Sequence, residues 1–306
     1  MNGIINVLKP PGMTSHDVVD FIRDTLNVSK AGHTGTLDPG AAGVMVICLG
    51  RSTRIAQFIT SADKQYRAEI TFGANTSTGD SFGEVIARYD ASGLTESAVR
   101  TALKIFTGRI EQVPPMVSAL KWHGKKLYEL ARAGQVAERK ARVVTINSLE
   151  YIKGDGWGTT KPVALLDLTC SKGTYVRTLC TDIGNYLGCG ACMSFLVRTR
   201  VGAFNISEAY TLEDIKANAN DISRIMVTME NVLAELPPVK VKYSAVSAVS
   251  SGSKLYLPGI AELPNGLDDG VIVRLQGPEG LLAVAKTARD PVDSSRWIFR
   301  PICVLV

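Results

Sequence analysis

The chain has 306 residues, of which 45% are apolar and 21% charged, which is typical of a soluble globular protein and excludes disordered, collagen-like and coiled-coil chains. No apolar run approaches the ~20 residues of a membrane-spanning helix, and the N-terminal residues lack the basic and apolar regions of a signal peptide. With six cysteines and a net charge of +5, these features predict a cytoplasmic protein with reduced thiols.

Helical and strand patterns alternate through most of the chain. A helix is predicted to begin at Ser15 as its N-cap and to end near Leu26, and a second helix is predicted over residues 53–62. Alternating apolar and polar residues predict a strand over residues 66–72. The later predictions are a helix capped by Thr95, a strand over Val163–Cys170, a helix from there to about Leu187, and a helix around residues 223–235.

Two prolines, Pro237 and Pro238, interrupt the pattern and predict a domain boundary. The residues after them form short apolar segments separated by Pro and Gly, with almost no helical pattern. This composition favours a small all-β barrel. We therefore predict two domains, residues 1–237 and residues 238–306.

One segment, residues 118–142, carries the whole excess of positive charge. Flat side chains lie between its basic residues, namely those of Trp122, His123 and Tyr128. Such a segment suits a polyanion whose bases can stack, which means a nucleic acid. A solvated surface loop is the alternative interpretation of the same charges. The basic residues are Lys121, Lys125, Lys126, Arg132, Arg139, Lys140 and Arg142.

Three places are candidates for chemistry. Asp38 lies in a glycine-rich loop, where it either caps the turn or acts on a substrate. Arg177 is predicted at the start of a helix, where its charge opposes the helix dipole, so a carboxylate from elsewhere is expected beside it. Tyr66 heads a predicted strand and is either a core residue or part of the site.

The sequence predicts no metal site. Cys189 and Cys192 form a lone C-x-x-C pair, and the three histidines lie far from it in the sequence, so the ligand set of a zinc site is missing. The motifs of serine hydrolases, P-loop proteins and dinucleotide-binding proteins are absent from the sequence.

Six separated blocks resemble the TruB family of tRNA pseudouridine synthases, in its bacterial stand-alone branch. Together they extend over residues 3 to about 236, and the tail resembles a PUA-type RNA-binding barrel. The resemblance implies an α+β pseudouridine synthase fold with a mixed, mostly antiparallel sheet flanked by helices. The blocks are Leu8–Ser15, Gly32–Gly50, Lys64–Gly83, Gln112–Lys121, Ser171–Gly184 and Leu196–Phe204.

The resemblance also implies an activity, which is conversion of the uridine at position 55 in the tRNA T-loop to pseudouridine without metal or cofactor. The family's catalytic aspartate maps onto Asp38, its basic partner onto Arg177, and the aromatic that stacks on the base onto Tyr66. Lys9 falls in a motif expected to support the active-site loop. The residue expected to fill the space of the flipped base is His33, and those expected to line the uracil pocket are Tyr175 and Leu196.

Residues 112–142 resemble the RNA-clamping insertion of the stand-alone enzymes, so Lys121, Lys125, Lys126 and Arg132 are expected to bind RNA. The implied partner is the T-arm of tRNA, contacted by a monomer that needs neither a partner protein nor a membrane. Gly40 stands where the family commonly has Leu, and Ala42 where it has Thr, and we expect these small residues to loosen the loop.

Two other functions are compatible with the same features. The first is a catalytically silent protein that binds or folds tRNA, and the second is a synthase that depends on a guide RNA. The silent binder needs only the basic surface, whereas the enzyme also needs the Asp38 carboxylate. The guide-dependent enzyme would be inactive on bare tRNA. An additional tRNA-folding activity is compatible with the enzyme as well.

Overall fold

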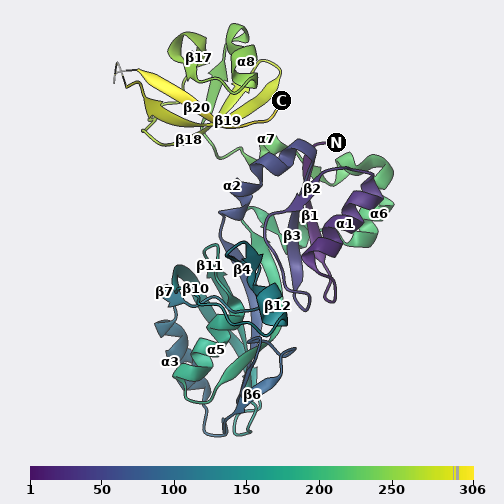
Figure 1. The fold of residues 1–306 in the computed structure, drawn as a ribbon, viewed down its shortest axis with the longest axis vertical. Coiled ribbons are helices and arrows are strands. Elements are labelled where there is room, and N and C mark those ends of the chain that lie inside the picture. Colours follow the sequence, from purple (N-terminus) through teal and green to yellow (C-terminus); the bar gives the residue numbers. More distant parts are fainter. Residues whose placement is uncertain (292, 294–295) are drawn as a thin grey trace.

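The centre of the molecule is a sheet of ten strands (Figure 1). The structure is a computed structural model that describes residues 1–291, 293 and 296–306. Its neighbouring strands are antiparallel except for β3 and β12, so the predicted mixed, mostly antiparallel sheet is confirmed. In spatial order the strands are β14 (Met226–Val227), β1 (Gly3–Lys9), β3 (Ala42–Leu49), β12 (Ala191–Val201), β4 (Lys64–Phe72), β11 (Val163–Cys170), β10 (Arg142–Asp155) and β7 (Gly108–Gln112), with β2 (Ala31–His33) on β3 and β13 (Phe204–Asn205) on β12.

The parallel contact between β3 and β12 lies at the middle of this sheet. Gly43 pairs there with Arg198 and has a φ of +112°, and a side chain at this position would collide with the Arg198 backbone. A glycine is therefore required at the start of β3. The close approach brings the loop that precedes β3, which carries Asp38, next to Arg198 on β12.

Two helix pairs cover the sheet at its two halves. Helices α3 (Glu96–Ile105) and α5 (Val176–Tyr186) share one apolar core with β4, β11 and β12. Helices α1 (Ser15–Leu26) and α6 (Leu212–Ala217) share another with β1 and β3. No helix of the described residues is long and apolar enough to cross a membrane.

The predicted helices at Ser15 and Thr95 are confirmed, and the cap of the first one is corrected. Thr95 caps α3 by accepting a hydrogen bond from the Ala98 amide. In α1 the N-cap is Thr14, whose hydroxyl accepts from the Asp17 amide. Ser15 is buried and its hydroxyl is bonded to another segment, the backbone of Leu37, so it is not available for capping.

Two predicted helices are shorter than the sequence pattern indicates. Residues 53–62 divide into a 3-10 helix, Gly50–Ile55, and α2 (Ala56–Thr60). Residues 223–235 contain only the end of a 3-10 helix, Ala219–Arg224, and α7 (Met229–Val232). Between them, Met226 of β14 pairs with Ile5 of β1, and this tertiary strand pairing replaces the helix.

The last part of the chain folds as a nearly closed six-stranded sheet, drawn in green and yellow at one end of Figure 1. The expected absence of helix is wrong, because α8 (Tyr243–Ser250) packs Val249 into the core of this sheet. The strands, in spatial order, are β16 (Leu255–Tyr256), β20 (Trp297–Val304), β19 (Gly280–Arg289), β18 (Ile272–Gly277), β15 (Pro238–Val241) and β17 (Ile260–Glu262), and the 3-10 helix Leu257–Gly259 lies between β16 and β17.

An apolar cluster joins this C-terminal sheet to the central sheet. We call it the junction cluster, because its side chains come from β1, β3 and β12 as well as from β19 and the C-terminal residues. It is formed by the buried residues Ile4, Val44, Val46, Cys48, Ile55, Ile59, Val201, Phe204, Leu233, Leu281, Val284 and Leu305.

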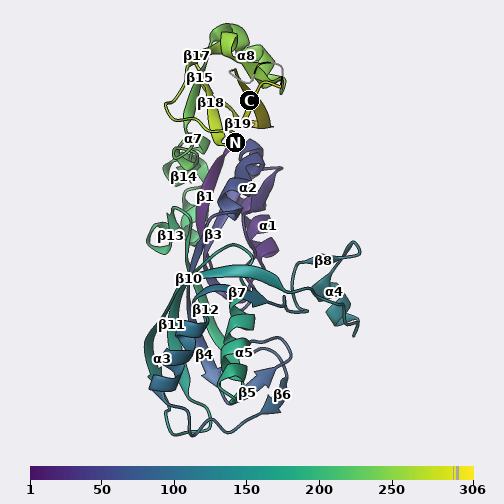
Figure 2. The same ribbon diagram turned by 90° about the vertical axis from the view of Figure 1, so that its left-hand side faces the viewer.

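The insertion, residues 112–142, projects from the side of the central sheet (Figure 2). It contains a short hairpin and helix α4 (Leu127–Arg132), which surround a small apolar core of Leu127, Leu130 and Ala137. A separate hairpin lies near α5. The strands of the two hairpins are β8 (Lys121–Trp122), β9 (Lys125–Lys126), β5 (Ala74–Thr76) and β6 (Val85–Arg88), and the remaining 3-10 helix is Ile206–Glu208.

The junction cluster predicts that stability depends on the last residues of the chain. Leu305 is 2% exposed and its neighbour Val306 is 44% exposed. We expect Leu305→Ala to lower the free energy of unfolding by about 2–5 kcal/mol because it leaves a cavity between the two sheets. The matched control, Val306→Ala, should change it by less than about 0.5 kcal/mol. Chemical denaturation measures both, and equal small effects would contradict the junction.

Candidate active site

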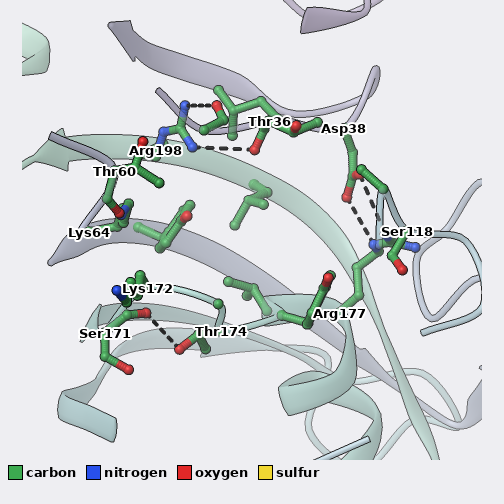
Figure 3. Close-up of a pocket in the computed structure, with 18 of the residues that line it drawn as sticks. Thr36, Asp38, Thr60, Lys64, Ser118, Ser171, Lys172, Thr174, Arg177 and Arg198 are labelled. Atoms are coloured by element: carbon green, nitrogen blue, oxygen red, sulfur yellow. Dashed lines mark hydrogen bonds and ion pairs between the residues drawn. The ribbon is translucent and has the colours of Figure 1, made fainter. Parts of the chain in front are cut away.

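A cavity of about 320 Å³ opens in the middle of the central sheet, where the sequence blocks meet (Figure 3). We call it the Asp38 cavity. The Asp38 loop (residues 32–41), strands β4 and β12, the start of α5, and residues 118–120 of the insertion all line it. Of the proposed site residues, Asp38, Tyr66, Tyr175, Arg177 and Leu196 are brought together here.

Two buried cations hold the backbone of the Asp38 loop. The Lys9 ammonium donates to the carbonyls of Pro39 and Ala41, at 3.2 and 2.7 Å, and to that of Pro10. Burial lowers the pKa of Lys9 to about 8, which leaves it charged at neutral pH. The Arg198 guanidinium donates to the carbonyls of Gly35, Thr36 and Val44, the first at 2.9 Å.

Between these two cations, Ser15 holds the residue that precedes the aspartate. Its hydroxyl accepts from the Leu37 amide and donates to the Leu37 carbonyl, both at 2.8 Å. The loop backbone is therefore fixed by side chains of three other elements, α1, β1 and β12. With the backbone held in this way, the Asp38 carboxylate faces the cavity.

Arg177 pairs with Asp38 as the sequence predicts. Its side chain is 5% exposed, and its Nε lies 2.9 Å from Asp38 Oδ2 and 3.7 Å from a second carboxylate, Asp80. The remaining donors bind backbone carbonyls of Thr78 and Val117, each at 2.8 Å. A guanidinium fixed on four sides keeps the Asp38 carboxylate oriented.

The side of the cavity away from this ion pair is lined by flat and apolar groups. Tyr66 on β4 and Arg198 on β12 are register partners, and burial raises the pKa of the Tyr66 hydroxyl. Leu196 is a buried neighbour on β12. The backbone of Tyr175 is fixed by Gln112, whose buried amide group donates to its carbonyl and accepts from its amide.

The remaining predicted residues lie outside the cavity lining. His33 is half-buried on β2, one residue before the lining residue Thr34, and burial lowers its pKa, which favours the neutral imidazole. Its Nδ1 is buried and has no hydrogen-bond partner. The cations of the insertion are exposed. Lys126 and Arg132 lie against the Tyr128 ring, and Lys121 and Lys125 lie on the two strands of the hairpin.

The space beside Gly40 is occupied by an aromatic ring. A Cβ atom at Gly40 would collide with the ring of Phe82, a residue whose side chain is 78% exposed. The ring stands where a larger residue at position 40 would place its own side chain. The expected loosening of the loop at Gly40 is therefore opposed by a contact from a segment distant in sequence.

This geometry suits cleavage at a sugar carbon with a single carboxylate. Among the described residues, Asp38 supplies the one carboxylate that lines the cavity, whereas Lys64, Lys172, Arg177 and Arg198 supply positive charge. Glycoside hydrolases use two carboxylates, one of them to deliver water. One carboxylate among four cations therefore suits an anionic substrate and gives no second acid among these described residues to deliver water.

Comparison with known proteins identifies the family. Residues 23–176 match the TruB family pseudouridylate synthase N-terminal domain, and residues 177–234 match the tRNA pseudouridylate synthase B C-terminal domain. The tRNA pseudouridine synthase B of Pelotomaculum thermopropionicum is 60% identical over 100% of this chain and 97% of its own. The chain belongs to the TruB family. Members of the TruB family isomerise uridine to pseudouridine in tRNA, and the chain is an enzyme of this class.

More distant TruB-family relatives agree in sequence and fold. The protein of the same name from Moorella thermoacetica is 44% identical over 99% of both chains. A chain in the crystal structure of a Cbf5–Nop10–Gar1 complex has a TM-score of 0.75 and 31% identity, covering 99% of this chain and 85% of that one. An H/ACA ribonucleoprotein bound to a substrate RNA containing 2′-deoxyuridine gives a TM-score of 0.74 and 28% identity, with 99% and 85% covered. The predicted pseudouridine synthase fold is confirmed.

Sequence reasoning missed three side chains of this TruB-family site. Asp80 was not singled out, although it lies in a matching block, because nothing in its neighbourhood indicates a contact with Arg177. Gln112 and Ser118 also lie in a matching block. Gln112 is bonded to Tyr175, and Ser118 is buried at the cavity. Neither property can be recognised from the sequence.

The contact between Gly40 and Phe82 predicts that the two positions are energetically coupled. Gly40→Leu should lower turnover in the native background, because the new side chain displaces the Phe82 ring. In a Phe82→Ala background the same change should cost less, with a coupling energy above about 0.5 kcal/mol. Initial rates of the four variants measure it. Val85→Ala, at an exposed residue of β6, is the control and should be additive with Gly40→Leu.

Proposed function

We propose that the protein converts the uridine at position 55, in the T-loop of tRNA, to pseudouridine, with Asp38 as its catalytic residue. The observation that carries this proposal is the Asp38 carboxylate, fixed 2.9 Å from a buried arginine at the mouth of a cavity that has no second carboxylate among its described lining residues. The family membership of the chain supplies the reaction class.

The chemistry explains why one carboxylate is enough. Breaking the bond between N1 and C1′ builds positive charge at C1′, which an adjacent carboxylate stabilises, either by attacking C1′ or by taking a proton from the sugar. The uracil then turns and rejoins C1′ through C5. The proton on C5 is released to solvent and N1 takes up a proton, so the product is an isomer of the substrate. Since no group leaves and no oxidation state changes overall, neither water nor a redox cofactor is required.

The remaining lining residues are proposed to hold the extruded base. A nucleotide inside the folded T-loop must leave its stack before it can react. Tyr66 offers a flat surface for the uracil, and Tyr175 and Leu196 are proposed to close the pocket around it. His33, whose neutral form is favoured by burial, lies just outside the cavity, where it is proposed to fill the place of the base.

Two further parts of the chain are proposed to bind the rest of the tRNA. The insertion projects from the sheet with its cations exposed, so Lys121, Lys125, Lys126 and Arg132 can reach phosphates of the T-arm. Residues 238–306 are proposed as a PUA-like RNA-binding domain next to a catalytic domain of residues 1–237. We further propose that the protein acts as a cytoplasmic monomer, in line with the resemblance of its sequence to the stand-alone enzymes.

Substitution of Asp38 tests the enzyme against a silent tRNA-binding protein. Asp38→Asn should abolish turnover, because the amide carries no charge to stabilise C1′, and should leave tRNA affinity within about tenfold, or ~1.4 kcal/mol. Turnover is measured as tritium released to water from an unmodified tRNA transcript labelled at uracil C5.

The possible outcomes separate the proposed enzyme from the two alternative functions. Release by the wild type and none by the variant supports the proposal. Release by both would show that Asp38 is not the catalytic group. Tight binding of bare tRNA without release by either protein would favour the silent binder or a guide-dependent enzyme.

The role of the insertion predicts a change in salt dependence. Replacing Lys125, Lys126 and Arg132 with Gln should weaken tRNA binding and reduce the slope of log affinity against log salt by about two to three, because three phosphate contacts are lost. A matched control neutralises three exposed cations outside the insertion, namely Arg88 on β6, Lys104 on α3 and Lys161 before β11. A slope that changes equally in both triple variants, or in neither, argues against the insertion as the tRNA contact.

A further inference from the structure

Ser118 has an unfilled hydrogen-bonding capacity at the Asp38 cavity. The residue is 7% exposed, and its Oγ is buried without a hydrogen-bond partner. The other described side-chain atoms in this condition belong to residues that do not line the cavity. A buried hydroxyl without a partner is costly, and such groups in native proteins are usually paired. The structure therefore leaves this hydroxyl available for a ligand in the cavity.

The backbone around Ser118 is fixed by hydrogen bonds, which holds its Cβ at the cavity. Its amide donates to the Met116 carbonyl at 3.0 Å, and its carbonyl accepts from the Tyr128 amide at 3.1 Å, both within the insertion. The preceding carbonyl, that of Val117, accepts from Arg177 Nη2 at 2.8 Å. The same Nη2 lies 3.4 Å from Asp38 Oδ1. Ser118 is thus linked through a single guanidinium nitrogen to the catalytic carboxylate.

These contacts place Ser118 on the sugar side of the cavity. Figure 3 shows it beside the ion pair of Asp38 and Arg177, while Lys64 and Arg198 lie at the other end of the lining. On the proposed function, Asp38 faces the ribose near C1′. The polar groups of a ribose next to C1′ are the ring oxygen and the 2′-hydroxyl. Of these two, only the 2′-hydroxyl both donates and accepts, as the serine hydroxyl does.

We propose that Ser118 Oγ binds the 2′-hydroxyl of the target nucleotide and so makes the site selective for RNA over DNA at that position. A contact to the 2′-hydroxyl is what allows a protein to distinguish the two sugars. The inference rests on the proposed function of the site. It also gives the insertion a second task, because the segment that carries the exposed cations supplies a group that contacts the reacting sugar.

A binding cycle tests the contact. The ligands are two T-arm stem–loop RNAs that differ only in having uridine or 2′-deoxyuridine at the target position. The proteins are full-length chains with Ser118, Ser118→Ala or Ser118→Thr, all carrying Asp38→Asn so that neither RNA is converted. Fluorescence anisotropy gives the Kd of each pair. Ser81→Ala, an exposed serine outside the cavity, is the matched control.

We expect Ser118 to favour the uridine RNA over the deoxyuridine RNA by about fivefold, the size of one hydrogen bond. Ser118→Ala should abolish this preference by weakening only the uridine RNA, whereas Ser118→Thr should restore it and Ser81→Ala should retain it. Equal weakening of both RNAs, or an unchanged preference, would overturn the contact with the 2′-hydroxyl. If Ser118→Ala does not fold, Ser118→Thr and Ser118→Cys provide the same comparison, with loss of the preference expected for Cys alone.

The same proteins with Asp38 intact separate this inference from the proposed function. Tritium release from the uridine RNA by the wild type tests the function alone. Release together with a failed binding cycle would overturn only the Ser118 contact. Absence of release would overturn the function, and the Ser118 inference with it.

Discussion

The active site depends on how the protein satisfies the backbone carbonyls of the Asp38 loop. A loop with buried carbonyls needs donors, and here most come from the charged ends of Lys9 and Arg198 rather than from a neighbouring strand. Each cation is fixed by several carbonyls and has no carboxylate as its main partner. Lys9 and Arg198 therefore hold the backbone on the two sides of Asp38, and Arg177 pairs with the carboxylate itself.

Arg177 connects three parts of the molecule that are distant in sequence. Its donors reach the Asp38 loop, the segment around Thr78 and Asp80, and the base of the insertion at Val117. A guanidinium is suited to this because its donors diverge in one rigid plane. The insertion is therefore connected to the Asp38 carboxylate through one side chain.

The sequence predicted those elements and contacts that depend on local residue patterns or on the blocks that resemble the family. The strand Val163–Cys170, the cap at Thr95 and the pairing of Arg177 with a carboxylate follow from residue type and spacing alone. The cap at Ser15 was wrong because its hydroxyl is used by a loop 22 residues away, a competition that no local pattern reveals. Ser118 was missed for a related reason, since burial and the lack of a partner are properties of the folded chain.

The junction cluster has a consequence for how the protein forms during synthesis. Ile4 in the first strand shares its apolar environment with Leu305, almost at the other end of the chain. A nascent chain therefore completes the junction cluster only after Leu281, Val284 and Leu305 have left the ribosome. Until then β1 and β3 can bury this face only against the earlier members of the cluster, so the packing between the two sheets forms last.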